Sequence, residues 1–261
     1  SRMKTDYHVH IGHDTNRWGF RLTPEEVVSG MDTYGIGRSV VFACPNVVPS
    51  QSDPYLEDNR EVLHASQKYS RLTPFMFVHP YRDSPKQIDE NREHFAGFKV
   101  YCNAEGMAYP YDEIHRTYVM QRLLETGKPI LFHIGAGEGE RIINLSRFLS
   151  EAESPVILAH AGRFFKTDLC YASNIPNVYI DIAPLRLLLE KPMFVSNDFR
   201  FEGNFERDCE MMREYIVPLF DKRVLWGSDR PWPDNLASHG FEGENQVYEI
   251  FKEHLGEITL S

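Results

Sequence analysis

Cysteine and long apolar runs are scarce in this sequence of 261 residues. Its four cysteines, Cys44, Cys102, Cys170 and Cys209, lie far apart and form no C-x-x-C pair, which argues against a disulfide framework or a structural zinc site made of cysteines. Free thiols fit a reducing compartment, so we predict a cytoplasmic protein. No apolar run approaches the roughly 20 residues that span a bilayer, and no basic segment precedes an apolar signal core, so we expect no membrane partner.

An excess of positive charge is also missing. Lys and Arg number 28 against 38 Asp and Glu, which gives a formal net charge of -10. Such a surface repels phosphate backbones, so we expect no nucleic-acid partner. Apolar residues at 42% and charged residues at 25% are typical of a soluble globular protein. A small-molecule substrate is therefore the expected partner, and a homo-oligomer stays open.

What the chain does contain is a repeated alternation of short apolar runs with segments of helical spacing. The apolar runs carry few charges, which predicts parallel strands that are buried on both faces. We therefore predict an α/β fold, a (β/α)8 TIM barrel that spans residues 1–261 as one domain, with a doubly wound sheet as the alternative. The strands are expected at 5–12, 39–45, 72–80, 97–102, 129–135, 155–162, 177–183 and 223–228, and the helices at 24–34, 59–69, 85–94, 111–126, 140–153, 167–174, 206–220 and 244–255.

The segment 184–204, after the seventh predicted strand, is long for a connection in a barrel. It includes Phe194, Phe199 and Phe201 among charged residues. We predict a long loop that either covers the site as a lid or packs on the barrel rim.

His8 and His10 are two residues apart in the first predicted strand, so both imidazoles point to the same side, which in a barrel is the interior. Such a pair is a good start for a zinc-type site, although a hydrogen-bonded pair fits the motif as well. Polar residues also end three later strands, His133 the fifth, His160 the sixth and Asp229 the eighth. Because barrel enzymes draw catalytic groups from the carboxyl ends of several strands, we expect all five at one mouth.

Taken in order, these motifs resemble those of the amidohydrolase superfamily. They are H-x-H on the first strand, Gly97-Phe98-Lys99-Val100 on the fourth, His133 on the fifth, His160-Ala161-Gly162 on the sixth and Gly227-Ser228-Asp229 on the eighth. The resemblance covers nearly the whole chain. It points in particular to the amidohydrolase-related branch, which includes aminocarboxymuconate-semialdehyde decarboxylase and similar lactonases and aromatic-acid decarboxylases.

The resemblance implies a barrel of the metal-dependent hydrolase type in which His8, His10, His133 and Asp229 bind one divalent metal. Zinc is the leading candidate, because a catalytic zinc takes nitrogen and carboxylate ligands and leaves a position open for water, whose pKa it lowers to about 7. Asp229 and His160 are the predicted catalytic residues. We expect Asp229 to accept the proton when the water attacks, and His160 to orient the water or to polarise the substrate.

Lys99 lies within an apolar strand, where an unpaired ammonium is costly. In binuclear members of the superfamily, a lysine at this place is carbamylated and bridges two metals, and the histidines of the fifth and sixth strands bind the second. A second metal bridged by carbamylated Lys99 is therefore the alternative to a lysine that binds substrate or pairs internally.

Three further residues are candidates for substrate binding. Arg163 and Arg230 directly follow site motifs, and either guanidinium could hold a substrate carboxylate in bidentate fashion, with a rim salt bridge as the alternative. Trp232 is a candidate for the pocket wall.

We predict that the protein is an enzyme that hydrolyses an amide, ester or lactone in a small substrate that is carboxylated or aromatic. Non-oxidative decarboxylation of a small aromatic carboxylic acid is the alternative, since the branch contains both reactions. A non-catalytic metal-binding or ligand-binding barrel is a third hypothesis, which the presence of Asp229 and His160 as proton-transfer candidates disfavours.

Overall fold

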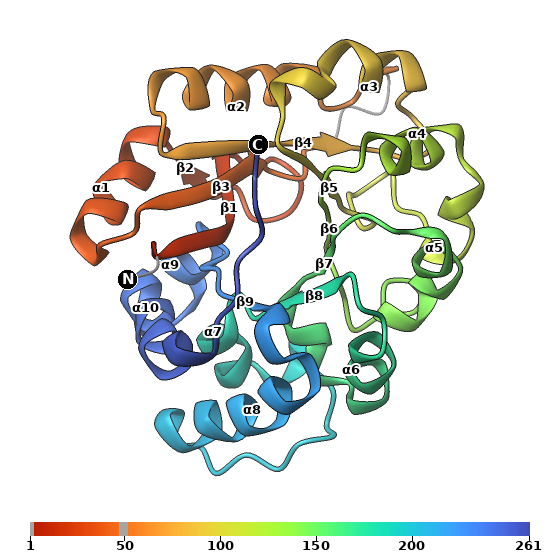
Figure 1. Ribbon diagram of the computed structural model, residues 1–261. Helices are drawn as coiled ribbons and strands as arrows, with labels where there is room; N and C mark the ends of the chain where they lie inside the picture. Colours follow the sequence, from red (N-terminus) through yellow and green to blue (C-terminus); the bar gives the residue numbers. More distant parts are fainter. Residues whose placement is uncertain (1–2, 47–51) are drawn as a thin grey trace.

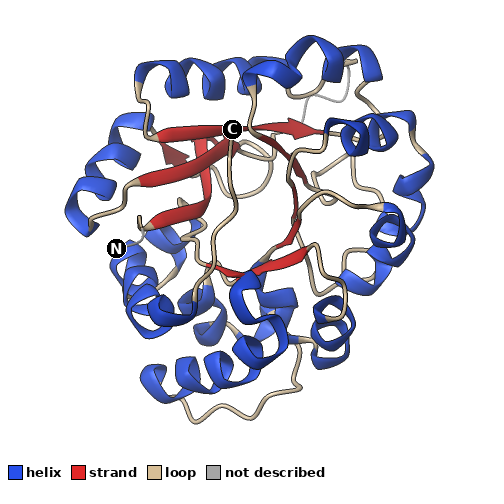
Figure 2. Cartoon of the chain, in the orientation of Figure 1, coloured by secondary structure: helices blue, strands red, loops and turns tan. Residues whose placement is uncertain are grey.

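A curled sheet surrounded by helices makes up the part of the chain that the computed structural model describes, residues 3–46 and 52–261 (Figure 1). The sheet has nine strands in the order β2-β1-β3-β4-β5-β6-β7-β8-β9. Neighbouring strands pair in parallel, except that the two-residue β2 is antiparallel to the end of β1. Figure 2 shows the strands in the centre with the helices arranged around them.

The sheet curls far enough for its first and last parallel strands to meet. Three backbone hydrogen bonds of 2.8 to 3.1 Å join residues 7–10 of β1 to residues 226–230 at the end of β9. The buried Asp6 carboxylate strengthens this seam, since it accepts from the N–H groups of His8 at 3.1 Å and Ser228 at 2.9 Å. The arrangement agrees with the predicted (β/α)8 barrel, in which β1 and β3 to β9 are the eight barrel strands.

The strands are short, and their bounds are β1 Thr5–His13, β2 Arg21–Leu22, β3 Arg38–Ala43, β4 Leu72–Val78, β5 Gly97–Val100, β6 Ile130–Phe132, β7 Val156–Leu158, β8 Val178–Asp181 and β9 Val224–Leu225. All but the two-residue β2 overlap a predicted strand. The later ones stop before the predicted ends, because His133, His160 and Asp229 follow the paired residues and lie outside the ladder. The chain thus leaves the sheet at the positions where polar side chains were expected.

The helices are α1 Pro24–Tyr34, α2 Leu56–Lys68, α3 Pro85–Asn91, α4 Tyr118–Thr126, α5 Ser146–Glu151, α6 Lys166–Ser173, α7 Leu185–Glu190, α8 Phe205–Phe220, α9 Trp232–Leu236 and α10 Gly240–Phe251. The start of α1 shows how the sequence sets a boundary: Thr23 and Glu26 form a reciprocal capping box around Pro24. Within the described ranges, none of the helices is long and apolar enough to span a bilayer.

Residues 184–204 differ from the prediction of a long loop, because they contain α7 and a 3-10 turn at Pro192–Phe194. The prediction was wrong here since Leu185, Leu187 and Leu188 are buried and give the segment an apolar face that packing can fold. Glu244 of α10 accepts from two N–H groups in the first turn of α7 at 3.0 and 3.1 Å. These backbone donors, which have no partner within their own helix, are thereby satisfied.

The last residues of the chain cross the amino end of the barrel (Figure 1). There the N–H of Ile258 donates to the hydroxyl of Tyr7, near the start of β1, at 3.0 Å. This segment covers the end of the barrel that is opposite to the carboxyl ends of the strands, where the candidate site lies.

Candidate metal centre

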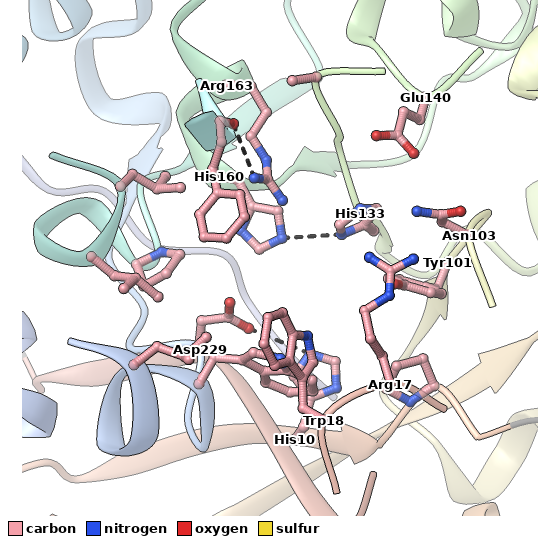
Figure 3. Close-up of a pocket in the computed structure, with 18 of the residues that line it drawn as sticks. His10, Arg17, Trp18, Tyr101, Asn103, His133, Glu140, His160, Arg163 and Asp229 are labelled. Atoms are coloured by element: carbon pink, nitrogen blue, oxygen red, sulfur yellow. Dashed lines mark hydrogen bonds and ion pairs between the residues drawn. The ribbon is translucent and has the colours of Figure 1, made fainter. Parts of the chain in front are cut away.

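Two histidines of β1 and an aspartate after β9 converge at the carboxyl end of the barrel. Figure 3 shows His10 and Asp229 of this group. The Nε2 atoms of His8 and His10 lie 3.2 and 3.4 Å from the Oδ1 atom of Asp229. Ligand atoms about 2.1 Å from one tetrahedral cation are about 3.4 Å apart, so the three atoms have the spacing of a zinc-type site. The predicted convergence of these three side chains is therefore present, because the seam between β1 and β9 places them side by side.

The other ring nitrogen of each β1 histidine is held by a hydrogen-bond acceptor. His8 Nδ1 lies 2.8 Å from Asp181 Oδ2, and His10 Nδ1 lies 2.8 Å from the carbonyl oxygen of Ala43. A proton on each Nδ1 leaves the lone pair of Nε2 for a metal, which is the usual arrangement around histidine ligands. Both Nε2 atoms face Asp229, so the outer partners orient the rings toward one point.

Electrostatics in this cluster favour a charged Asp229. Burial would raise the pKa of Asp229, but the neighbouring His8, by its charge, and His10 hold it well below its usual value. Burial and Lys99 act to lower the pKa of His8, yet Asp181 and Asp229 raise it overall. Burial lowers the pKa of His10 to about 4. The cluster thus offers a carboxylate and a neutral imidazole before any cation arrives.

His133 and His160 form a second pair beside the cluster (Figure 3). His160 Nδ1 lies 2.7 Å from the carbonyl oxygen of Ala183, so its Nε2 is the acceptor toward His133 Nδ1 at 3.2 Å. Burial lowers the pKa of both rings well below the usual value. In the part of the chain that the structure describes, His133 does not join the group of His8, His10 and Asp229, and its role as a metal ligand stays a prediction.

The backbone around His160 is unusual. From His160 to Phe164, five consecutive residues have φ between 50° and 65°, a left-handed turn in which only Gly162 lacks a side chain. Each non-glycine residue in this conformation costs about 1–2 kcal/mol, so other contacts must hold the turn. The turn brings His160 and Arg163 into the lining of the same cavity. Strain at this place is typical of a functional site.

Lys99 of β5 is fully buried under the site. Its Nζ lies 3.2 Å from His8 Nε2 and 4.7 Å from the centre of the Phe42 ring. Burial lowers the pKa of Lys99 to about 8. Lys99 is fully buried and does not line the cavity, which favours the internal pairing given as an alternative. A carbamylated Lys99 that bridges a second metal stays a prediction.

A cavity of about 310 Å³ opens above these residues. One side of it is polar, and Figure 3 shows Arg17, Tyr101, Asn103, Glu140 and Arg163 around His133. Much of the remaining wall is apolar and includes Trp18, Leu187, Leu188, Met193, Phe194, Trp232 and Leu236. The segment 184–204 therefore forms part of the wall of the site.

Two of the three substrate-binding candidates lie in this cavity. Arg163 donates to the carbonyl oxygens of Ile134 at 2.8 Å and Phe194 at 3.1 Å, which leaves part of its guanidinium for a ligand. The ring of Trp232 lies edge-on to His10, with ring centres 4.7 Å apart. Both side chains thus line the cavity, and their role in substrate binding stays a prediction.

The third candidate, Arg230, must be corrected. Its guanidinium is directed away from the cavity, where it pairs with Asp234 at 2.8 Å and stacks over Phe241 at 4.3 Å. The side chain is buried and holds α9 and α10 against the barrel. Adjacency to Asp229 was misleading, because successive residues after a strand point in different directions.

Sequence reasoning missed Asp181, the last residue of β8, which contacts both His8 and the backbone of His160. It is fully buried. The pattern that identified His133 and His160, a polar residue at the end of an apolar run, also holds for the run Val178-Tyr179-Ile180-Asp181 and could have identified it. Asn103 and Glu140 lie in loops and carry no such pattern.

Comparison with known proteins agrees with the motifs. A family model described as amidohydrolase matches residues 6–251. No curated protein is significantly similar to the chain. Many solved structures are similar in fold, and three of them are described next.

A probable 2-pyrone-4,6-dicarboxylic acid hydrolase from Acinetobacter baumannii, with citric acid bound, has a TM-score of 0.68 at 15% identity over 96% of this chain and 93% of that chain. An amidohydrolase from Burkholderia multivorans with bound zinc has a TM-score of 0.68 at 13% identity over 98% and 93%. A putative 2-pyrone-4,6-dicarboxylic acid hydrolase from Pseudomonas putida has a TM-score of 0.66 at 16% identity over 96% and 90%. At such identities these likenesses concern the fold.

Proposed function

The chain belongs to the amidohydrolase family, and on this basis we propose that it is a metal-dependent hydrolase of a small molecule. The proposed reaction is hydrolysis of an amide, ester or lactone in a substrate that also carries a carboxylate. The observation that carries the proposal is the convergence of His8 Nε2, His10 Nε2 and Asp229 Oδ1 at the floor of the cavity. Supporting evidence comes from the solved amidohydrolase with bound zinc and the same fold.

The donor atoms fit a divalent cation, and zinc best. Two imidazole nitrogens and a carboxylate oxygen are ligands that zinc prefers, and their separations of 3.2 and 3.4 Å suit a tetrahedral site. When bound, the cation supplies Lewis acidity and makes water a better nucleophile at neutral pH. We propose His133 as a further ligand, because it lies next to the cluster and lines the cavity.

Asp229 is the residue we assign to proton transfer. Its Oδ1 faces the two histidines, while its side chain remains 12% exposed toward the cavity. From this position it accepts the proton of the attacking water and returns it to the leaving group.

His160 acts beside Asp229 in this proposal. The carbonyl oxygen of Ala183 keeps the proton of His160 on Nδ1, at 2.7 Å, so Nε2 is directed toward His133 and the cavity. The ring is thereby fixed in orientation, which suits a group that orients the reacting water or polarises the substrate. The left-handed turn after it adds to this rigidity.

Arg163 and Trp232 are the proposed substrate contacts. Arg163 keeps donors free for a carboxylate on the polar side of the cavity, where Arg17 adds a second positive charge. Trp232 and the side chains of α7 form an apolar wall opposite. A small carboxylated substrate with an apolar or aromatic part matches this division.

Metal content per chain is the decisive measurement, made on protein purified without chelators or metal-affinity resin. We expect about one zinc per chain and loss of metal and hydrolysis in Asp229→Asn. Asp208→Asn is the matched control, since Asp208 is also buried but accepts from backbone N–H groups of Glu202 and Gly203 outside the cavity. Wild-type protein that holds no metal and gains no activity with added zinc would refute the proposal.

The same measurements separate the alternatives. A ratio near two metals per chain would place a second cation at the pair of His133 and His160 beside Lys99. Release of carbon dioxide from carboxylated aromatics, without hydrolysis of lactones or amides, would show a decarboxylase. Stoichiometric metal with no turnover of any compound in such a panel would favour a binding protein.

A further inference from the structure

Asp181 has three hydrogen-bond donors around one fully buried carboxylate. Oδ2 accepts from His8 Nδ1 at 2.8 Å. Oδ1 accepts from the backbone N–H groups of Ala183 at 2.9 Å and His160 at 3.3 Å. Both oxygens are therefore engaged, and each faces a different part of the candidate site.

We propose that Asp181 is the positioning residue of the metal centre, fixing the proton of His8 on Nδ1 and the backbone of His160 at the start of the left-handed turn. This inference rests on the proposed function and deepens it. A proton on Nδ1 means that Nε2, which faces Asp229 at 3.2 Å, is the nitrogen that offers its lone pair to a cation.

The second bond serves the other half of the site. The five residues from His160 to Phe164 adopt a conformation that is unfavourable for residues other than glycine. Hydrogen bonds at the start of the turn must therefore stabilise it. The N–H of His160 is the first donor of the turn, and Asp181 accepts from it. One carboxylate thus links the orientation of a proposed ligand to the position of a proposed catalytic group.

Direct metal ligation by Asp181 is less suitable, although Asp181, His8 and His160 also offer closely spaced ligand atoms. A cation at Asp181 would have to displace the hydrogen bond to His8 Nδ1 and would leave two buried backbone N–H groups without an acceptor. The carboxylate would also stand on the far side of His8 from Asp229. A positioning role keeps all three donors satisfied.

Asp181→Asn tests the proposal because an amide cannot satisfy all three donors. If its oxygen keeps the two backbone N–H groups, its NH2 group faces His8 Nδ1 and moves the imidazole proton to Nε2. The same change of the aspartate in a Ser-His-Asp triad keeps the geometry but fixes the wrong tautomer of the histidine. We expect the zinc dissociation constant, measured by competition with a chromophoric chelator, to rise by about 10–100-fold.

A second readout needs no metal. In zinc-free protein labelled with 15N-histidine, the ring signals of His8 are assigned by their loss in His8→Gln. We expect a protonated Nδ1 in the wild type and an unprotonated Nδ1 in Asp181→Asn. If Asp181→Asn does not fold, Asp181→Ser replaces it, since its hydroxyl is too short to reach His8, and the same rise in the dissociation constant is expected.

Asp208→Asn is again the control and should leave zinc affinity and the His8 signals unchanged. Zinc affinity within about twofold of the wild type in the Asp181 variant, with His8 Nδ1 still protonated, would overturn the inference. Wild-type protein that binds no zinc would instead overturn the proposed function, and the nitrogen signals would still decide whether Asp181 sets the tautomer of His8.

Discussion

Glu244 of α10 gives a sharp prediction about stability, because its carboxyl group has no solvent exposure and contacts the first turn of α7, the helix that forms part of the cavity wall. Its oxygens accept from the N–H groups of Arg186 and Leu187 at 3.1 and 3.0 Å. Burial raises the pKa of Glu244 to about 8, against an ordinary value of 4.5. The perturbation we choose is Glu244→Gln, which has nearly the same shape and no titration.

The magnitude follows from linkage. A group whose pKa is raised in the folded state stabilises that state fully below its unfolded pKa, and this contribution is lost as the pH rises through the folded pKa. From pH 4.5 to pH 8 the folded wild type holds one more proton, so its free energy of unfolding falls by about 1.4 kcal/mol per pH unit, about 5 kcal/mol in total. The glutamine variant lacks this slope.

Glu244→Gln also has a cost that does not depend on pH. Its NH2 group meets one of the two backbone N–H groups, which costs about 1–3 kcal/mol. We therefore expect the wild type to be more stable near pH 5, the two curves to cross between about pH 5 and pH 7, and the variant to be more stable at pH 8.

The assay is urea unfolding of both proteins at four pH values from 5 to 8, with a chelator present so that metal does not alter the charge near Asp229. The difference between the two free energies cancels the titration of all other groups. A difference that stays constant with pH would refute the reasoning, because it would mean that the two backbone donors at the start of α7 keep Glu244 ionised.

Two further predictions concern the cavity and the turn behind it. Arg163→Met should raise KM for a carboxylated substrate by about 10–100-fold, whereas Arg230→Met should leave KM unchanged, as measured by steady-state kinetics. Both variants should lower the free energy of unfolding by about 1–3 kcal/mol in urea unfolding, because each removes hydrogen bonds of a guanidinium that is at least partly buried. Equal KM values in both variants would contradict the assignment. Gly162→Ala should destabilise the protein by about 2 kcal/mol or more, because φ is 58° there and a new Cβ would lie 2.8 Å from Ile142. Ala161→Gly, at φ 50° in the same turn, should change stability by less than about 1 kcal/mol, and the reverse ranking in thermal unfolding would argue against strain in the turn.

The fold was largely predictable because its elements depend on local patterns. Charge-poor apolar runs separated by helical spacing marked every parallel strand, and the helix predicted at 24–34 has the bounds of α1. Residues 184–204 were not predictable in the same way. The helix α7 has only six residues, and it depends on Glu244 from a distant helix for its first-turn acceptor, which no local pattern contains.

The site was predictable where a local pattern marks a residue. His8 and His10 were found because they share one face of the first strand, and His133, His160 and Asp229 because each follows an apolar run. Asp181 satisfies the second rule. The direction of a side chain beyond the end of a strand was not predictable from the sequence. Arg163 and Arg230 both follow a site motif, but the left-handed turn directs the first to the cavity, while Asp234 and Phe241 hold the second outside it. These conformations depend on tertiary contacts.

The circular order of the strands explains which of these residues meet. Asp229 reaches His8 and His10 because β9 closes on β1, and His133 reaches His160 because β6 and β7 are neighbours. Asp181 ends β8, between the strand that carries His160 and the strand that carries Asp229, so it can contact the backbone of one neighbour and, across β9, the ring of His8. In an open doubly wound sheet, the first strand lies in the middle and the last at an edge, so β9 would not pair with β1 and the contacts between His8 and Asp181 or Asp229 would not form. Closure of the barrel is therefore what turns five separate strand ends into one site.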